Sequence, residues 1–189
     1  DEDSQTKFIA ENYDELFKRG GTPYADVAQA QETIERVKKQ PLMMHYLSGK
    51  HQKIMIGEIE GVPFKIKMDV HNPEFITDLK TCASFAPVYK PGEGRLTFIE
   101  AYGYTLQGAI YQAVEGHNKP FYIAAITKEA VPDIAVVEIG QAYLDTELKI
   151  LREKLPLYDA IKQGVVEPTR CEHCDYCKAT RKLKGPITL

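Results

Sequence analysis

The spacing of apolar residues changes along the chain from a helical period to an alternating one and back again. Residues 8–17 and 22–37 carry apolar side chains every three or four positions, a pattern that predicts two amphipathic helices. Thr22 is expected to cap the second helix, and Pro41 to open a further, short one. The first 49 residues are therefore interpreted as a helical segment.

The pattern becomes that of a sheet beyond residue 50. Residues 52–59 and 62–70 alternate in polarity on either side of Glu60-Gly61, which predicts a β-hairpin, and residues 75–81 form a further strand. The remaining expected elements are a loop over residues 84–95, a helix from Phe98 to near Gly116, strands over residues 121–126 and 134–139, and a long helix from Gln141 towards Lys162, bent or interrupted at Pro156. This order predicts an α/β fold with a central mixed sheet flanked by helices.

Length and composition fit a single folded domain over residues 1–189, because 43% of the side chains are hydrophobic. We expect it to comprise the helical segment 1–49, a core over residues 50–165 and a C-terminal tail over residues 166–189. No stretch approaches the length of a membrane helix and no signal peptide is visible, so we expect a cytoplasmic protein. The chain begins with Asp1 rather than Met, which we interpret as a start inside a longer protein.

The formal net charge is −3 at neutral pH, which counts mildly against binding of nucleic acid by the charge of the whole molecule. Basic residues nevertheless cluster locally. The clusters are Lys50, Lys53, Lys65, Lys67, Lys90 and Arg95 in the middle of the chain, and Lys178, Arg181, Lys182 and Lys184 near its end. Taken singly, each of these residues is typical of a solvated surface.

The strand over residues 75–81 carries a carboxylate and an ammonium two positions apart. Residues i and i+2 of a strand project to the same face, so Asp78 and Lys80 are expected to point together. The preceding strand ends in Asp69, and the turn between the strands can bring Asp69 close to Asp78. Paired carboxylates suit a hard divalent cation such as Mg²⁺, and the neighbouring lysine suits a bound water or phosphate. The alternative is a structural salt bridge at the end of a strand.

A second motif lies on the helix that follows. Gln107 and Tyr111 are one turn apart, on one face with Tyr104. Asp69, then Asp78-Leu79-Lys80, then a Gln-x-x-x-Tyr helix resembles the PD-(D/E)XK nuclease superfamily and its RecB-type branch. Within that branch the chain is most similar to phage and prophage exonucleases related to RecE (exonuclease VIII) and, more distantly, to lambda exonuclease.

The resemblance implies a restriction-endonuclease-like core and a role for each of these residues. Asp69, Asp78 and the backbone carbonyl of Leu79 would hold Mg²⁺, for which Mn²⁺ can substitute, and Lys80 would orient water or stabilise developing negative charge. Gln107 and Tyr111 would line the cleft, although both could equally be helix packing. Glu58 is a candidate for a further acidic ligand that could also be a solvated strand residue.

The implied activity is that of a Mg²⁺-dependent DNA exonuclease that resects the ends of linear double-stranded DNA for phage-type recombination. The expected partners are DNA ends and a single-strand annealing protein, and relatives that form rings suggest a homo-oligomer. Relatives also carry an N-terminal helical segment with a further acidic or histidine site residue, for which this sequence shows no convincing counterpart. The proline- and glycine-rich loop over residues 84–95 follows the site, where a mobile loop would contact the substrate.

Three of the four cysteines form the separate motif Cys171-x-x-Cys174-x-x-Cys177. Thiolates at this spacing readily surround one metal ion, and they fit a reducing cytosol better than a disulfide framework. His173, Cys82 or a cysteine outside this chain could supply a fourth ligand. The resemblance adds a 4Fe–4S cluster as an alternative to zinc, although the C-terminal cysteines of such relatives are often more widely spaced.

Two other functions fit the same residues less well. The chain could be a non-catalytic nucleic-acid-binding protein of the same fold, with a zinc-stabilised tail. It could also be a metal-dependent enzyme that acts on a different phosphate ester.

Overall fold

The computed structural model describes residues 2–183 and 185–186. The chain divides into two compact units, and the boundary in the sequence falls between Lys149 and Ile150, inside helix α7 (Gln141–Lys162). The expected single domain, with boundaries at residues 49 and 165, stays a prediction.

The first unit begins with helices and continues as a sheet. Its elements before α7 are α1 (Glu2–Glu11), α2 (Tyr13–Leu16), α3 (Ala25–Lys38), α4 (Pro41–Tyr46), β1 (Lys50–Ile59), β2 (Val62–His71), β3 (Ile76–Cys82), β4 (Val88–Lys90), β5 (Gly94–Leu96), α5 (Phe98–Ala101), α6 (Tyr104–Glu115), β6 (Phe121–Thr127) and β7 (Ile134–Ile139).

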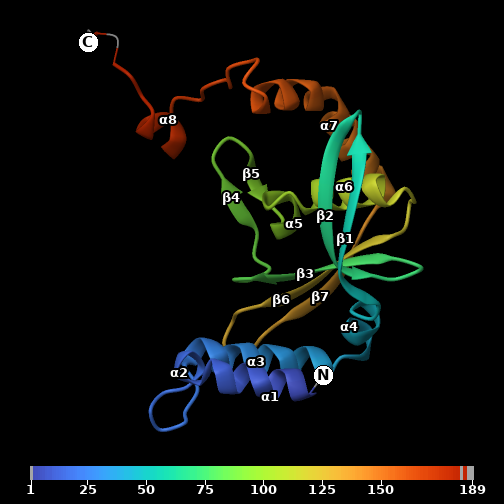
Figure 1. Ribbon diagram of the computed structural model, residues 1–189, viewed down its shortest axis with the longest axis vertical. Helices are drawn as coiled ribbons and strands as arrows, with labels where there is room; N and C mark the ends of the chain where they lie inside the picture. The colour runs from blue at the N-terminus through green and yellow to red at the C-terminus, as the bar shows by residue number, and fades with distance from the viewer. Residues whose placement is uncertain (1, 184, 187–189) are drawn as a thin grey trace. The chain divides into compact units, whose positions relative to one another are not determined.

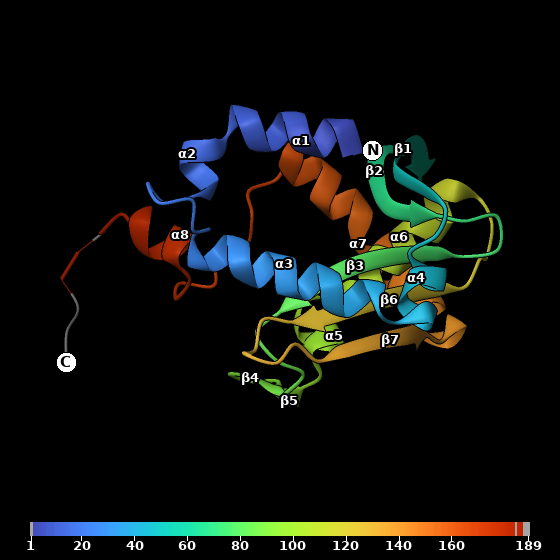
Figure 2. The ribbon, with the colours of Figure 1, turned by 90° about the horizontal axis from the view of Figure 1, so that it is seen from below.

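The central sheet has the order β1-β2-β3-β6-β7. β3 and β6 are parallel, whereas every other neighbouring pair in this sheet is antiparallel, so the sheet is mixed. Figure 1 shows α3 on one side of β3, β6 and β7 and α6 on the other side. In Figure 2, which is the view from below, α3 crosses in front of the sheet. The predicted α/β fold, with helices flanking a mixed sheet, is confirmed.

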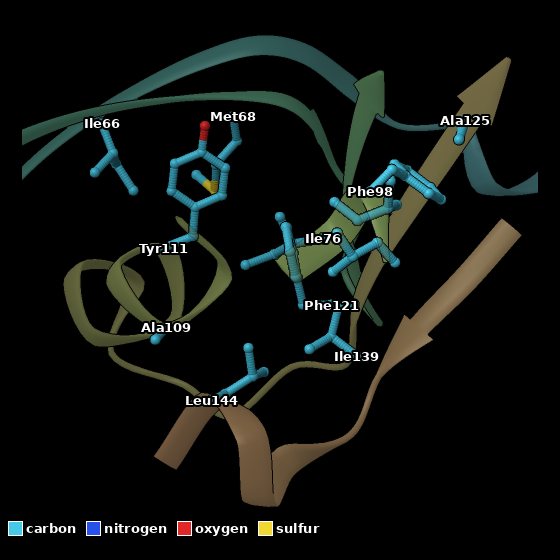
Figure 3. Close-up of a cluster of buried hydrophobic side chains, with 12 residues drawn as sticks. Ile66, Met68, Ile76, Phe98, Ala109, Tyr111, Phe121, Ala125, Ile139 and Leu144 are labelled. Carbon is cyan, nitrogen blue, oxygen red and sulfur yellow. The ribbon is translucent and has the colours of Figure 1, made fainter. Parts of the chain in front are cut away.

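The hydrophobic core lies between α6 and the sheet. Figure 3 shows Ile66 and Met68 of β2, Ile76 of β3 and Phe121 of β6 around this helix, all of them buried. Gly108 permits the close approach, because a Cβ atom at this position would lie 2.2 Å from Cδ1 of Phe121. The helix that carries two candidate site residues is therefore fixed against the sheet by packing.

The sequence located most elements correctly, with corrections to some boundaries and caps. The expected helix from Phe98 is two helices, since Gly103 adopts φ 68° between α5 and α6. The loop over residues 84–95 contains the two-stranded sheet β4-β5. Thr22 does not cap α3, which begins after Tyr24. Helix α7 continues through Pro156 without interruption, and a bend at this proline stays a prediction.

The second unit contains the C-terminal part of α7 and the short helix α8 (Asp175–Ala179). Cys174 caps α8, with its sulfur accepting a hydrogen bond from the backbone N–H of Cys177. Lys184 of the C-terminal basic cluster lies outside the described residues. Among the helices of the described residues, none is both long and apolar enough to cross a lipid bilayer.

Candidate active site

The site forms where β2 and β3 separate. Their pairing ends at Val70 and Thr77, and one further step of this register places Asp69 opposite Asp78. Beyond that point the Asp69 side chain replaces the backbone ladder, since its Oδ2 accepts a hydrogen bond from the Leu79 N–H at 3.0 Å. The two carboxylates therefore lie across adjacent strands, as the sequence predicted.

Gln52 holds the other oxygen of Asp69. Gln52 Nε2 donates a hydrogen bond to Asp69 Oδ1 at 2.8 Å. Gln52 belongs to β1 and has a backbone φ of 53°. This contact could not be predicted from the sequence, because a lone glutamine in an edge strand is ordinary. Only the strand register shows that Gln52 lies opposite Asp69.

Asp78 is the most deeply buried charged residue of the site, with 2% of its side chain exposed. Burial raises the pKa of Asp78, and the nearby Lys80 ammonium opposes that shift. Lys80 Nζ lies 2.5 Å from Asp78 Oδ2, so the two groups form an ion pair. The expectation that the two side chains share a face of β3 is confirmed by this ion pair.

Helix α6 holds the second oxygen of Asp78 through the predicted pair. Gln107 Nε2 donates to Asp78 Oδ1 and to the Tyr111 hydroxyl, both at 2.7 Å. That hydroxyl donates to the Lys67 carbonyl at 2.8 Å, with Asp78 Oδ1 farther away at 3.3 Å. Figure 3 shows the hydroxyl directed from α6 towards β2. Burial raises the pKa of Tyr111 to about 12, so this group stays a neutral donor.

The same face of α6 continues to Glu115, one turn after Tyr111. Glu115 lies 2.9 Å from the Nε2 atom of His71 of β2 and forms an ion pair with Lys119 at 2.6 Å. Gln107, Tyr111 and Glu115 therefore form a polar stripe that fixes α6 to β2 and β3 beside the carboxylates.

The ring of Tyr104 also contacts Lys80. The Lys80 ammonium lies 4.6 Å from the centre of the Tyr104 ring, a cation–π distance. The sequence placed Tyr104 on the face of Gln107 and Tyr111, but not against Lys80. The Asp78 carboxylate and the Tyr104 ring both contact the ammonium and hold it beside Asp78.

The arrangement suits a divalent cation. Asp78 Oδ2 is buried beside the Lys80 ammonium at 2.5 Å, and this ion pair leaves further lone pairs of the carboxylate for a metal beside Asp69. Glu58 does not fit as a further ligand, because it is exposed and six residues along β1 from Gln52, roughly 20 Å in a strand.

Similarity to a known protein family bears directly on this geometry. Residues 1–180 match the family described as a PDDEXK-like domain of unknown function (DUF3799). The chain belongs to this family. The resemblance to PD-(D/E)XK nucleases seen in the sequence is thereby confirmed at the level of the superfamily.

Solved structures also resemble this PDDEXK-like chain. It is similar to the crystal structure of a protein from Eubacterium rectale that is named as a candidate exonuclease, with 39% identity, a TM-score of 0.82 and coverage of 99% of this chain and 72% of the other. The structure of SSO0001 aligns with 15% identity and a TM-score of 0.39 over 92% of this chain and 77% of that one, too weakly to support a conclusion. No curated protein matches the sequence.

The second unit of this PDDEXK-like chain contains the predicted cysteine cluster. The sulfur atoms of Cys171, Cys174 and Cys177 all lie within 4.8 Å of one another. Backbone N–H groups of His173 and Cys174 lower the pKa of Cys171 to about 6, which favours the thiolate that binds metal. One ring nitrogen of His173 is not available as a metal ligand, because Nδ1 lies 2.7 Å from the Cys171 carbonyl oxygen.

Proposed function

We propose that this protein is a metal-dependent deoxyribonuclease that degrades linear double-stranded DNA from its ends. The observation that carries the proposal is the buried Asp78 opposite Asp69, with Lys80 forming an ion pair with the same carboxylate. Membership of a PDDEXK-like family and the name of the Eubacterium rectale protein support the same chemistry.

The residues that would hold Mg²⁺ are Asp69, Asp78 and the Leu79 carbonyl, with Mn²⁺ as a substitute. When bound, the cation lowers the pKa of a coordinated water and neutralises charge on the scissile phosphate. Lys80 places a fixed positive charge where the phosphate gains negative charge. Gln107 and Tyr111 orient Asp78 by occupying one of its oxygens, which leaves the other directed towards Lys80.

The finer parts of the proposal rest on the resemblance to RecE-like exonucleases. They are resection with 5′ to 3′ polarity, a role in phage-type recombination with a single-strand annealing protein, and assembly into a homo-oligomer around DNA. A terminally labelled linear duplex and a closed circle of the same sequence would distinguish attack at ends from internal cleavage.

The decisive experiment measures degradation of linear duplex DNA with Mg²⁺ or Mn²⁺. Asp78→Asn and Lys80→Ala are expected to lower the rate by about 10²-fold or more, because each removes charge from the reacting centre. Glu58→Gln is the matched control, since this acid is exposed and distant from the pair.

Undiminished cleavage in Asp78→Asn and Lys80→Ala would exclude this site. Salt-sensitive DNA binding without cleavage would instead favour a binding protein of the same fold. Hydrolysis of small phosphodiesters without any dependence on DNA would favour the third function.

We also propose that Cys171, Cys174 and Cys177 hold a soft metal, either zinc or a 4Fe–4S cluster. Three sulfur atoms within 4.8 Å and a thiol of low pKa fit both groups. Elemental analysis with X-ray absorption at the iron and zinc edges would distinguish them.

A further inference from the structure

Two tyrosines, Tyr102 and Tyr104, lie next to Lys80, and the mechanism proposed above assigns no step to them. The rings of Tyr102 and Tyr104 stack, with centroids 5.9 Å apart and planes inclined by 30°. Tyr104 is half-buried and faces Lys80, whereas 59% of Tyr102 is exposed. A large aromatic ring is thus presented to solvent at the edge of the site.

The backbone fixes this exposure. Tyr102 is the C-terminal cap of α5, whose N-terminus is closed by a capping box between Thr97 and Glu100. Gly103 follows with φ 68° and begins α6. Because both helices are anchored by buried residues, the turn between them holds Tyr102 in place at little further entropic cost.

The two tyrosines line a cavity of about 490 Å³, together with Thr81, Cys82, Ala83 and Lys128. The cavity begins directly after Lys80 on β3, and the Lys128 N–H donates to the Cys82 carbonyl at 2.8 Å. It therefore combines an aromatic wall, a short strip of backbone and one basic residue, Lys128. Its volume lies in the range of small-molecule sites.

We propose that this cavity binds the nucleobase of an unpaired nucleotide adjacent to the scissile phosphate, stacked on Tyr102. The inference rests on the proposed nuclease function and names the form of DNA that enters the site. Stacking on an aromatic face tolerates every base, which suits an enzyme that must process any sequence. Lys128 supplies the charge that the neighbouring phosphate requires.

The occupant must be single-stranded at this position, because a base that is paired inside a duplex stacks on its neighbours and offers no free face. The end of a duplex is where unpairing costs least. The cavity thus favours frayed or mismatched ends over perfectly paired ones.

The test uses a duplex whose terminal nucleotide is 2-aminopurine, a base whose fluorescence falls on stacking against an aromatic ring. Asp78→Asn is the common background, so that no cleavage occurs during the titration. Tyr102→Ala in this background is expected to abolish the quenching and to weaken binding by roughly tenfold. Tyr102→Phe is expected to retain both, which separates loss of the ring from misfolding.

Tyr143→Ala is the matched control, because Tyr143 is a similarly exposed tyrosine on α7 outside the cavity. Equal quenching in Tyr102→Ala and its parent would overturn the inference. So would equal loss in Tyr102→Ala and Tyr143→Ala. A second measurement uses wild-type residues at Asp78: cleavage of a duplex with two unpaired terminal bases should exceed that of a blunt duplex, and Tyr102→Ala should remove the difference.

The two proposals fail in different ways. If the protein cleaves no DNA with any metal but Tyr102 still quenches the probe, the nuclease proposal is wrong and the nucleobase site stands. If cleavage depends on Asp78 and Lys80 while Tyr102→Ala leaves quenching and end preference unchanged, the nucleobase site is wrong.

Discussion

Asp78 shows how far reasoning from single residues reaches in this protein. The alternation of side chains along a strand correctly paired it with Lys80, and the turn between strands correctly brought Asp69 beside it. Gln52 and the Lys80–Tyr104 contact were not predicted, because both depend on elements distant in sequence. Local patterns identified the charged groups, whereas the groups that orient them required the tertiary fold.

The raised pKa of Asp78 predicts an unusual pH dependence of stability. Protonation of Asp78 is favoured more in the folded than in the unfolded protein, so its stabilising effect is complete below the unfolded pKa near 3.8 and is lost as the pH rises through the folded pKa. In EDTA at neutral pH, Asp78→Asn should therefore unfold at a higher temperature than the wild type. The difference should shrink as the pH falls towards 3.8.

Thermal unfolding followed by circular dichroism, between neutral pH and about pH 4, checks this expectation. Glu58→Gln, on an exposed position of β1, should follow the wild type throughout. A neutral-pH Tm for Asp78→Asn below that of the wild type would contradict the assignment of Asp78 as a buried carboxylate with a raised pKa.

Tyr111→Phe tests the hydroxyl that joins α6 to β2. Its removal leaves the Lys67 carbonyl without the 2.8 Å hydrogen bond and should cost about 1–2 kcal/mol of unfolding free energy. Nuclease activity should also fall, because Gln107 loses the acceptor that holds it against Asp78. Urea denaturation measures the first effect, and Tyr143→Phe, at an exposed tyrosine, should change stability by less than about 0.5 kcal/mol.

At the scale of elements, the sequence predicted the strands best and the boundaries of helices least well. Residues 134–139 form β7 as expected, since apolar periodicity reports burial directly. The pair β4-β5 was missed because a segment rich in proline and glycine resembles a loop. The break at Gly103 was missed because amphipathic spacing alone does not show where the backbone adopts a positive φ.

Gly108→Ala tests whether the packing of α6 controls the site. Alanine is the better helix former, but its Cβ would meet the Phe121 ring at 2.2 Å, and Phe121 is fully buried. We expect a net destabilisation of about 1–3 kcal/mol from overpacking, with activity lost as Gln107 and Tyr111 move with the helix.

Gly140→Ala is the control for this substitution. The nearest atom to its added Cβ lies 3.7 Å away, in ordinary contact, and Gly140 has no positive φ. Chemical denaturation of both variants should therefore separate them clearly. Equal stabilities would mean that α6 shifts freely on the sheet and does not position the site rigidly.

At the scale of the whole molecule, the chain divides its two candidate metal sites between its two units. Asp69 and Asp78, and the residues that orient them, lie before residue 149, whereas Cys171, Cys174 and Cys177 lie after it. Carboxylate oxygens select hard cations and thiolates select soft ones. The sequence predicted that each group of residues lies together, from the turn between two strands for Asp69 and Asp78 and from the short spacing of the cysteines.

This separation predicts that the two sites can be emptied independently. Cys177→Ser removes one of three clustered thiolates and should reduce the zinc or iron content of the purified protein at least tenfold, since loss of a ligand removes most of the affinity of a structural site. Binding of Mn²⁺ at Asp69 and Asp78, followed by electron paramagnetic resonance, should persist in the same variant. Cys82→Ser tests the remaining cysteine, which lies at the end of β3 in the first unit: an unchanged content of soft metal would exclude Cys82 as a fourth ligand. Asp78→Asn should give the reverse result, with the soft metal retained and Mn²⁺ binding lost. Joint loss of both metals in either variant would mean that one ion, shared or structural, organises the entire chain.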